Sequence, residues 1–196
     1  MKKFFYILVA TLISANISFA QTVIKDGDLE GGNTYTWTKD NVYLIDGFVF
    51  LEEDGVLNIE AGTVIKAKED PTTGDNASAL IIARNATINA IGTETEPIIF
   101  TCEIDDVSVN DDLDDTDQGL WGGLIILGNG IIGNTTPETG VEGIPAGETR
   151  ALFGGNDDTD NSGVLKYVSI RHGGAELAPG DEINGLTLGA VGSGTV

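Results

Sequence analysis

A phrase that recurs after about thirty residues is the feature that most constrains this chain. Segment 55–67 reads Gly-Val-Leu-Asn-Ile-Glu-Ala-Gly-Thr-Val-Ile-Lys-Ala, and segment 86–93 reads Ala-Thr-Ile-Asn-Ala-Ile-Gly-Thr. Each is a short alternating run that ends in a Gly-Thr pair, Gly62-Thr63 or Gly92-Thr93, before a new strand resumes. A strand that turns a corner and returns at a period of roughly 20 to 30 residues is typical of a solenoid. The repeat predicts a fold but, taken alone, no activity.

The remaining apolar runs agree with this interpretation. Segment 79–83, Ala-Leu-Ile-Ile-Ala, is apolar on both faces, as strands of parallel sheets are. Further strands are expected at 42–51, with a hairpin turn or a solenoid corner at Asp46-Gly47, and at 124–127, 164–170 and 186–189. Beyond the N-terminal leader no segment has a helical period. We therefore predict an all-β chain folded as a parallel β-helix, with a sandwich or jelly roll as the alternative.

The first twenty residues read as a secretory signal peptide. Lys2 and Lys3 precede an apolar run at 4–13, and Ser18-Phe19-Ala20 places small residues before a cleavage site after Ala20. The alternative, an N-terminal core helix, lacks support from the rest of the pattern. No later apolar stretch approaches the 18 residues of a membrane span. The protein is therefore expected to be secreted or displayed at the cell surface, without membrane insertion after cleavage.

Three segments follow from this division of the chain. Residues 1–20 are the signal peptide, 21–41 a polar lead-in or N-terminal cap, and 42–196 the β-helix. A solenoid needs a cap over its last rung, and residues 192–196, Gly-Ser-Gly-Thr-Val, resemble the start of a new strand. We expect these 196 residues to be the N-terminal part of a longer product.

Charge excludes some partners. The formal net charge is −21, and removing Lys2 and Lys3 with the leader takes it to −23. Such a field repels nucleic acid, anionic lipid and polyanionic substrates that calcium does not bridge, and it attracts divalent cations. The single cysteine, Cys102, cannot form an intramolecular disulfide and is expected to be a small side chain near a strand end.

One loop resembles half of a calcium site. Asp158, Asp160 and Ser162, followed by Gly163, place oxygen ligands at positions 1, 3 and 5 and a glycine at position 6. Position 12 is Ser169, so a bidentate carboxylate would have to come from elsewhere, such as the loop at 103–117. The alternative is a solvated acidic turn.

A second acidic cluster lies at 111–117. Five of these seven residues are aspartates, and Asp112, Asp114 and Asp117 are the candidate ligands that we select from it. A bound cation would relieve their mutual repulsion, but so would water and disorder.

Four segments carry a family resemblance. They are Gly-Leu-Trp-Gly-Gly-Leu-Ile-Ile-Leu-Gly-Asn (119–129), Val-Glu-Gly-Ile-Pro-Ala-Gly-Glu (141–148), Asp-Asn-Ser-Gly-Val-Leu-Lys-Tyr-Val-Ser-Ile-Arg-His-Gly-Gly (160–174) and Glu-Ile-Asn-Gly-Leu-Thr-Leu-Gly-Ala-Val-Gly-Ser-Gly-Thr (182–195). They resemble secreted, right-handed parallel β-helix proteins of Bacteroidetes-type bacteria, which often carry a C-terminal sorting domain for type IX secretion. The resemblance implies a right-handed coil that continues beyond this point, and it supplies no catalytic residues.

An enzymatic interpretation rests on Arg171-His172-Gly173-Gly174. Pectin-degrading β-helix hydrolases combine an aspartate pair, a Gly-His-Gly and an Arg-Ile-Lys on neighbouring rungs, which Asp157-Asp158 and His172 match only in part. We therefore expect His172 to be a corner residue. No Ser-His-Asp set, phosphate-binding glycine loop or Cys/His metal spacing is present.

Aromatic residues offer a further candidate surface. Trp121, Trp37 and Tyr43 have rings that stack on sugars in lectin-like sites. Between two glycine-rich stretches, Trp121 is better explained as a corner anchor.

These observations predict an exported, non-catalytic scaffold for adhesion or glycan contact, stabilised by calcium. Its partner would be a glycan or a surface protein, met by the excursions at 103–118 and 134–163. The alternative is a polysaccharide lyase or glycoside hydrolase of the pectin-lyase type. Carboxylates paired with each other, or with Arg or Lys, in a cleft would discriminate the two.

Overall fold

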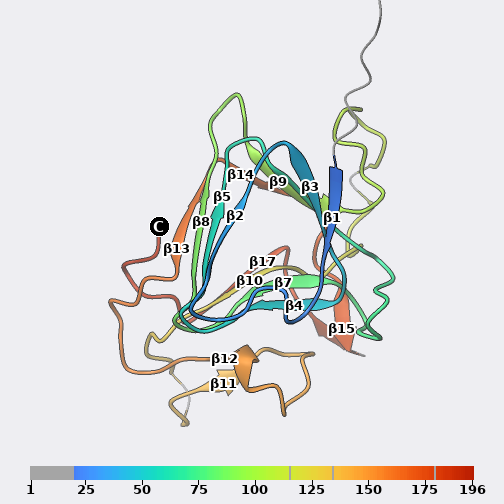
Figure 1. Cartoon of the computed structure of the whole chain (residues 1–196). Coiled ribbons are helices and arrows are strands. Elements are labelled where there is room, and N and C mark those ends of the chain that lie inside the picture. Colours follow the sequence, from blue (N-terminus) through green and yellow to red (C-terminus); the bar gives the residue numbers. More distant parts are fainter. Residues whose placement is uncertain (1–19, 115, 134, 179) are drawn as a thin grey trace, which may run out of the picture.

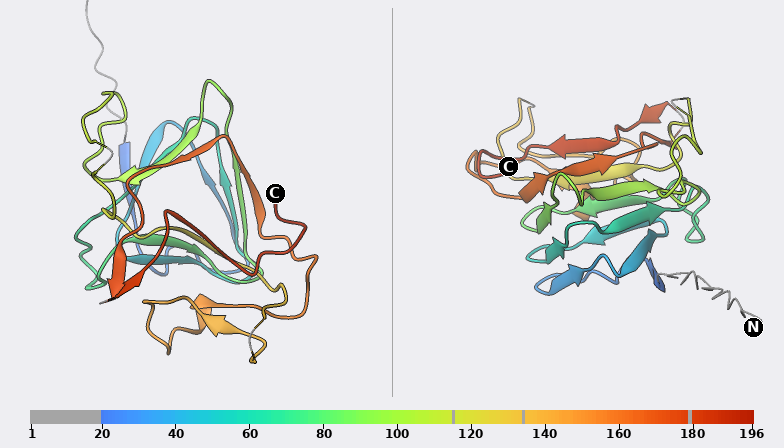
Figure 2. Two further views of the ribbon diagram at one scale, coloured as in Figure 1. Left: turned by 180° about the vertical axis from the view of Figure 1, so that it is seen from behind. Right: turned by 90° about the horizontal axis from the view of Figure 1, so that it is seen from above.

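Three parallel sheets form the sides of a triangular coil (Figure 1). The computed structural model describes residues 20–114, 116–133, 135–178 and 180–196, so the expected signal peptide at 1–20 lies, except for Ala20, outside the described residues. The chain visits sheets B, A and C in turn, and successive rungs stack along one axis (Figure 2). The predicted parallel β-helix is confirmed.

Sheet A consists of β1 (Ala20–Ile24), β3 (Asn41–Ile45), β6 (Val64–Ala67), β9 (Ile98–Cys102) and β14 (Val168–Ile170). Sheet B consists of β2 (Thr34–Trp37), β5 (Val56–Ile59), β8 (Thr87–Ile91) and β13 (Gly163–Lys166). Sheet C consists of β4 (Phe48–Leu51), β7 (Ala79–Ile82), β10 (Gly123–Leu127) and β17 (Leu186–Gly189).

The excursions between rungs carry the remaining elements. Two short antiparallel pairs join β11 (Thr139–Gly140) to β12 (Leu152–Phe153) and β15 (Glu176–Ala178) to β16 (Asp181–Glu182). A 3-10 turn, η1 (Thr149–Ala151), precedes β12. No described residues form a helix long and apolar enough to span a membrane.

The thirty-residue phrase corresponds to two stacked rungs. Leu57 pairs with Ile88 and Ile59 with Ala90 across β5 and β8, and all four side chains are buried inside the coil. Each Gly-Thr pair follows a strand of sheet B and precedes a strand of sheet A. The corner at Asp46-Gly47 separates β3 in sheet A from β4 in sheet C, so it is a solenoid corner rather than a hairpin turn.

Three strands of sheet C are buried on both faces because two excursions cover their outer side. These strands, β4, β7 and β10, are buried throughout. Outside the coil they form a second apolar cluster with residues such as Val141, Ile144, Ala151 and Leu177. The excursion at 134–163, expected to meet partners, thus also protects the coil. The run at 79–82 is apolar on both faces for this reason.

One local expectation differs from the structure. Segment 164–170 was predicted as one strand, but Tyr167 has a positive φ of 50° and divides it into β13 and β14. Tyrosine rarely adopts this conformation. Because the corner has no glycine, the sequence gives no sign of it. Segment 21–41, expected as a lead-in or cap, contributes β1 and β2, and Ile24 and Leu29 belong to the inner core.

A polar ladder follows the corner between sheets C and B. Asn85 donates to Glu53 at 2.7 Å and accepts from Asn129 at 2.7 Å, and Asn129 also donates to Asp160 at 3.0 Å. Side chains of three successive levels are thereby joined along the coil axis, since Asn129 and Asp160 both lie between β10 and β13.

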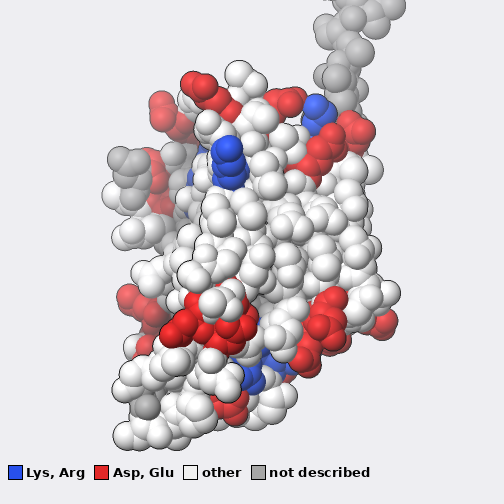
Figure 3. All heavy atoms as spheres, turned by 90° about the vertical axis from the view of Figure 1, so that its left-hand side faces the viewer, with Lys and Arg blue, Asp and Glu red and all other residues white. Residues whose placement is uncertain are grey.

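Acidic residues gather at corners and loops. The side of the molecule that exposes sheet B has a central area without acidic side chains, which cluster above and below it (Figure 3). Its strands present residues such as Thr36, Asn58 and Asn89 outwards. The outer face of sheet B therefore carries little negative charge between charged corners and loops.

Candidate functional site

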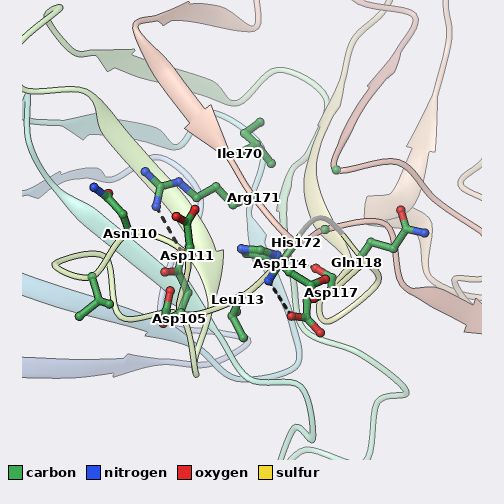
Figure 4. Close-up of a pocket in the computed structure, with 14 residues that line it drawn as sticks. Asp105, Asn110, Asp111, Leu113, Asp114, Asp117, Gln118, Ile170, Arg171 and His172 are labelled. Atoms are coloured by element: carbon green, nitrogen blue, oxygen red, sulfur yellow. Dashed lines mark hydrogen bonds and ion pairs between the residues drawn. The ribbon is translucent and has the colours of Figure 1, made fainter.

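The first excursion and the end of β14 enclose a polar cleft of about 710 Å³. Its walls come from the acidic loop at 105–118 and from the segment 170–173, which are distant in sequence (Figure 4). The carboxylates that line it are Asp105, Asp111, Asp112, Asp114 and Asp117. Arg171 and His172 face them from the opposite wall.

A second cleft of about 470 Å³ adjoins the first. The two share Gln118, Gly173 and Gly185, and the second adds the carboxylates of Glu176 and Glu182. Together they form an extended polar groove, called the groove below.

Arg171 is held by its neighbours rather than by the acidic loop alone. Its Nη1 lies 3.6 Å from Oδ2 of Asp105, and its Nε donates to the Ser169 hydroxyl at 3.2 Å. Asp105 is 2% exposed and also accepts a hydrogen bond from the Thr101 hydroxyl. The carboxylate is thus a buried anchor for a guanidinium whose side chain remains 39% exposed.

Trp121 fixes the backbone of this wall. Its indole Nε1 donates to the carbonyl of Arg171 at 2.7 Å, and its side chain is 1% exposed. The expected corner anchor is therefore confirmed, and the ring offers no face to a sugar. Trp37 and Tyr43 stack on each other inside the coil, with ring centroids 4.6 Å apart, so they are not surface sugar-stacking residues either.

His172 lies at a corner, as the sequence indicated, with a φ of 54°. Its Nδ1 contacts the main-chain oxygen of Asp117, and its own carbonyl accepts from the amide of Leu120 at 2.9 Å. These contacts join the wall of the groove to the base of the acidic loop. The sequence did not place His172 in a cleft, because its neighbours there lie more than fifty residues earlier.

The predicted aspartates at 112–117 shape the loop through their own backbone contacts. Asp112 accepts from the amide of Asp106 at 2.6 Å, and Asp117 accepts from the amide of Asp114 at 2.8 Å. Hydrogen bonds from the hydroxyl and amide of Thr116 lower the pKa of Asp114. Asp115 lies outside the described residues.

The predicted calcium loop at 158–163 lies at another corner of the coil. Asp158 accepts from the amide of Ile131 at 2.8 Å, while Asp160 accepts from Asn129 at 3.0 Å and from the Ser162 hydroxyl at 3.0 Å. Asp160 and Ser162 are thus brought together, and Asp158 points to a different partner. Among the residues that the structure describes, no three His, Cys, Asp or Glu side chains form a metal-binding group.

Two groups that matter to the groove were not selected from the sequence. Asp105 is the buried partner of Arg171, and Lys66 donates to the carbonyls of Glu103 and Asp105 at 3.0 and 2.7 Å, where the loop leaves β9. The sequence signal for this part of the site is the four-residue spacing between Thr101 in β9 and Asp105 after it, which allows a local contact. Cys102 lies at the end of β9, as expected; it is buried, and burial raises the pKa of its thiol.

Comparison with known proteins agrees with the architecture. No curated protein and no solved structure shows a significant match to this sequence. A family model described as a pectate-lyase-like β-helix domain matches residues 27–196. This match includes every rung from β2 onward, the groove and both excursions, and the chain therefore belongs to the family of pectate-lyase-like β-helix domains.

Proposed function

We propose that the protein is an exported, non-catalytic β-helix scaffold that contacts a glycan through the groove, at the cell surface or after secretion. The observation that carries this proposal is the pair of adjoining polar clefts that share Gln118, Gly173 and Gly185. Several sugar units of a linear glycan would lie along such a groove, donating hydroxyl protons to the carboxylates and accepting from Arg171.

The engagement of the polar groups supports a binding role. Arg171 contacts Asp105 and Ser169, and His172 contacts the carbonyl of Asp117. Asp112 and Asp117 hold main-chain amides of the loop. Groups committed to shaping a surface are suited to recognition, since a catalytic acid or base needs an unobstructed approach to the substrate.

Charge narrows the class of glycan. Seven carboxylates line the groove against one guanidinium, and the whole chain has a formal charge of −21. A polyuronate would be repelled. We therefore favour a neutral glycan.

Binding measurements on a panel of oligosaccharides test this proposal. Gln118 is exposed and lines both clefts, so Gln118→Ala should weaken binding of a neutral oligosaccharide about fivefold without loss of stability. Arg171→Ala should weaken it about tenfold or more. Lys39→Ala, which removes an exposed ion pair with Glu96, is the matched control. Equal affinity in all three variants, or binding of polyuronates only, would contradict the proposal.

A catalytic function is the second candidate, and one observation favours it. The groove brings Arg171 and His172 beside carboxylates in a cleft, which is the arrangement by which we expected to recognise a lyase or hydrolase. Formation of a product from any glycan of the panel would establish this alternative.

Calcium is a separate part of the proposal. Binding at Asp158, Asp160 and Ser162 would require their oxygens to exchange contacts with Ile131 and Asn129 for the ion. Calcium should then raise the midpoint of thermal unfolding in wild type and not in Asp160→Asn. An unchanged midpoint with calcium or chelator would remove the ion from the account.

A further inference from the structure

A cavity of about 460 Å³ lies between the first strand of sheet C and the excursion that covers it. Phe48 and Phe50 of β4 form its floor, and Ile144, Pro145 and Gly147 form a wall. The carboxylates of Asp26, Asp75 and Glu148 line it as well. It shares no residue with the groove.

The protein already places one of its own cations in this cavity. The guanidinium of Arg150 lies 4.2 Å from the centroid of the Phe50 ring. Its Nη1 and Nη2 each lie 2.9 Å from an oxygen of Asp26, and Nη2 also donates to Glu148 at 2.7 Å. An aromatic ring surrounded by carboxylates is an environment that binds a cationic side chain. The contacts of Arg150 show that this cavity provides such an environment.

The other half of the cavity repeats this chemistry without a cation of its own among its lining residues. Oδ2 of Asp75 accepts from the amide of Phe48 at 3.0 Å and from the Thr73 hydroxyl at 2.6 Å, which fixes the carboxylate beside the main chain of Phe48. Three carboxylates therefore line the cavity against the single guanidinium of Arg150.

The shape of the floor distinguishes between ligands. The Phe48 residue is only 9% exposed, so it offers too little ring surface for a sugar to stack flat. The narrow alkyl stem of a lysine or arginine side chain needs less exposed ring surface, because it packs along an apolar wall while its charged end reaches a carboxylate.

We propose that this cavity binds a lysine or arginine side chain of a basic polypeptide partner, with the stem between Phe48 and Ile144 and the cation at Asp75. The partner adds to the glycan contact proposed above and does not depend on it. The formal charge of −21 would speed its approach by long-range attraction. Binding of the side chain inside the cavity distinguishes the proposed interaction from general attraction to the acidic surface.

The test uses a fluorescent peptide in which two lysines are separated by glycine, and its counterpart with norleucine in place of lysine. Gly147 lines the cavity, and a Cβ atom there would meet no atom within 4 Å, so Gly147→Leu adds an isobutyl group at the cavity wall and should weaken lysine-peptide binding about tenfold. Gly133→Leu, where a Cβ atom also meets nothing within 4 Å, is the control, just before the same excursion and outside the cavity lining. Norleucine should abolish binding.

A pair of charge variants separates the cavity from general attraction. Asp75→Asn should weaken binding of the lysine peptide about tenfold at physiological salt. Asp114→Asn removes an exposed carboxylate from the groove instead and should change binding less than about twofold. Absence of peptide binding, equal losses in Asp75→Asn and Asp114→Asn, or equal losses in Gly147→Leu and Gly133→Leu would each overturn the proposal.

Discussion

Asp46 is fully buried at the corner between sheets A and C. Its carboxylate accepts from the amide and hydroxyl of Thr72, each at 2.6 Å, and from Lys68 at 3.1 Å. Burial alone would raise the pKa of Asp46, but the bonds from Thr72, Lys68 and Lys25 outweigh it and hold the pKa well below its usual range. A buried charge thus ties the loop after β6 to an earlier corner.

Asp46→Asn should lower the free energy of unfolding by about 3 kcal/mol, because it leaves Lys68 beside a neutral group. An unfolded aspartate titrates near pH ~3.9, above the folded pKa, so the stabilisation is complete above that pH and is lost as the pH falls towards the folded pKa. Urea titrations at several pH values should show a shallower acid dependence in the variant. Asp40→Asn, at an exposed turn, should change stability by less than about 0.5 kcal/mol; an equal loss there would contradict the role of Asp46.

Single residues also mark where prediction from sequence ends. Asp46-Gly47 was recognised as a turn because its residue types favour one, and Leu57 and Ile88 were placed in the rungs by their repeat. Tyr167 carries no such signal, since a positive φ in tyrosine is imposed by the coil around it. The contact of Asp105 with Arg171 joins positions 66 residues apart, and local pattern does not predict it.

At the scale of elements, β17 at the C-terminal end of sheet C buries less apolar surface than its neighbour β10. Ile126 of β10 and Leu188 of β17 are register partners with the same orientation, yet they are 1% and 51% exposed. β17 is an edge strand of sheet C, and β10 lies between two strands.

Ile126→Ala should therefore cost about 3 kcal/mol or more of unfolding free energy, and Leu188→Ala about 1 kcal/mol. Chemical denaturation of both variants measures the difference. Equal costs would show that the end of sheet C is covered in solution.

The excursion over sheet C is fastened by arginines. Besides Asp26 and Glu148, Arg150 reaches Glu52 at 3.2 Å, and Arg84 donates to Glu138 at 2.8 Å and to the carbonyl of Gly154 at 2.9 Å. Exposed ion pairs contribute little individually, but here they hold an apolar covering in place.

Arg150→Ala should loosen this covering and speed proteolysis between residues 135 and 153 several-fold. Limited digestion followed by mass spectrometry locates the cuts. Lys39→Ala breaks an exposed pair with Glu96 on another loop and serves as the control; identical digestion patterns in both variants and wild type would contradict the fastening role.

Strand patterns predicted the elements better than the excursions. Alternation and doubly apolar runs identified β5, β7 and β8 because burial in a coil imposes that pattern. Loop composition at 134–163 indicated only a polar excursion. Part of this excursion packs on sheet C through a few apolar residues, Val141 and Ile144 among them. These residues are not regularly spaced in the sequence, so no pattern predicts the packing.

At the scale of the whole molecule, export is the first requirement of the proposed role. If the leader is cleaved after Ala20, β1 keeps the pairing of Gln21 to Ile24 with Val42 to Ile45. The coil therefore tolerates the predicted cleavage.

Expression with the native leader should yield a secreted protein whose N-terminus is Gln21. Intact mass and N-terminal sequencing measure it. A product that retains Met1 and stays inside the cell would contradict export.

The groove illustrates which features of a binding site can be predicted from the sequence. Acidic residues at 111–117 and Arg171-His172 were each noticed, but as separate motifs. The acidic loop follows β9 and Arg171-His172 follows β14, and the pairing of β14 with β9 in sheet A brings them together. The family match supports that coil and leaves the chemistry of the groove to experiment.

The most direct test of the central claim is product analysis during glycan binding. Wild-type protein and Arg171→Ala are incubated with the oligosaccharides that wild type binds, and reducing ends and unsaturated products are followed over time by chromatography. The account predicts bound, unchanged glycan with wild type and weakened binding with Arg171→Ala. Cleaved or unsaturated glycan that forms with wild type and not with Arg171→Ala would contradict a non-catalytic scaffold.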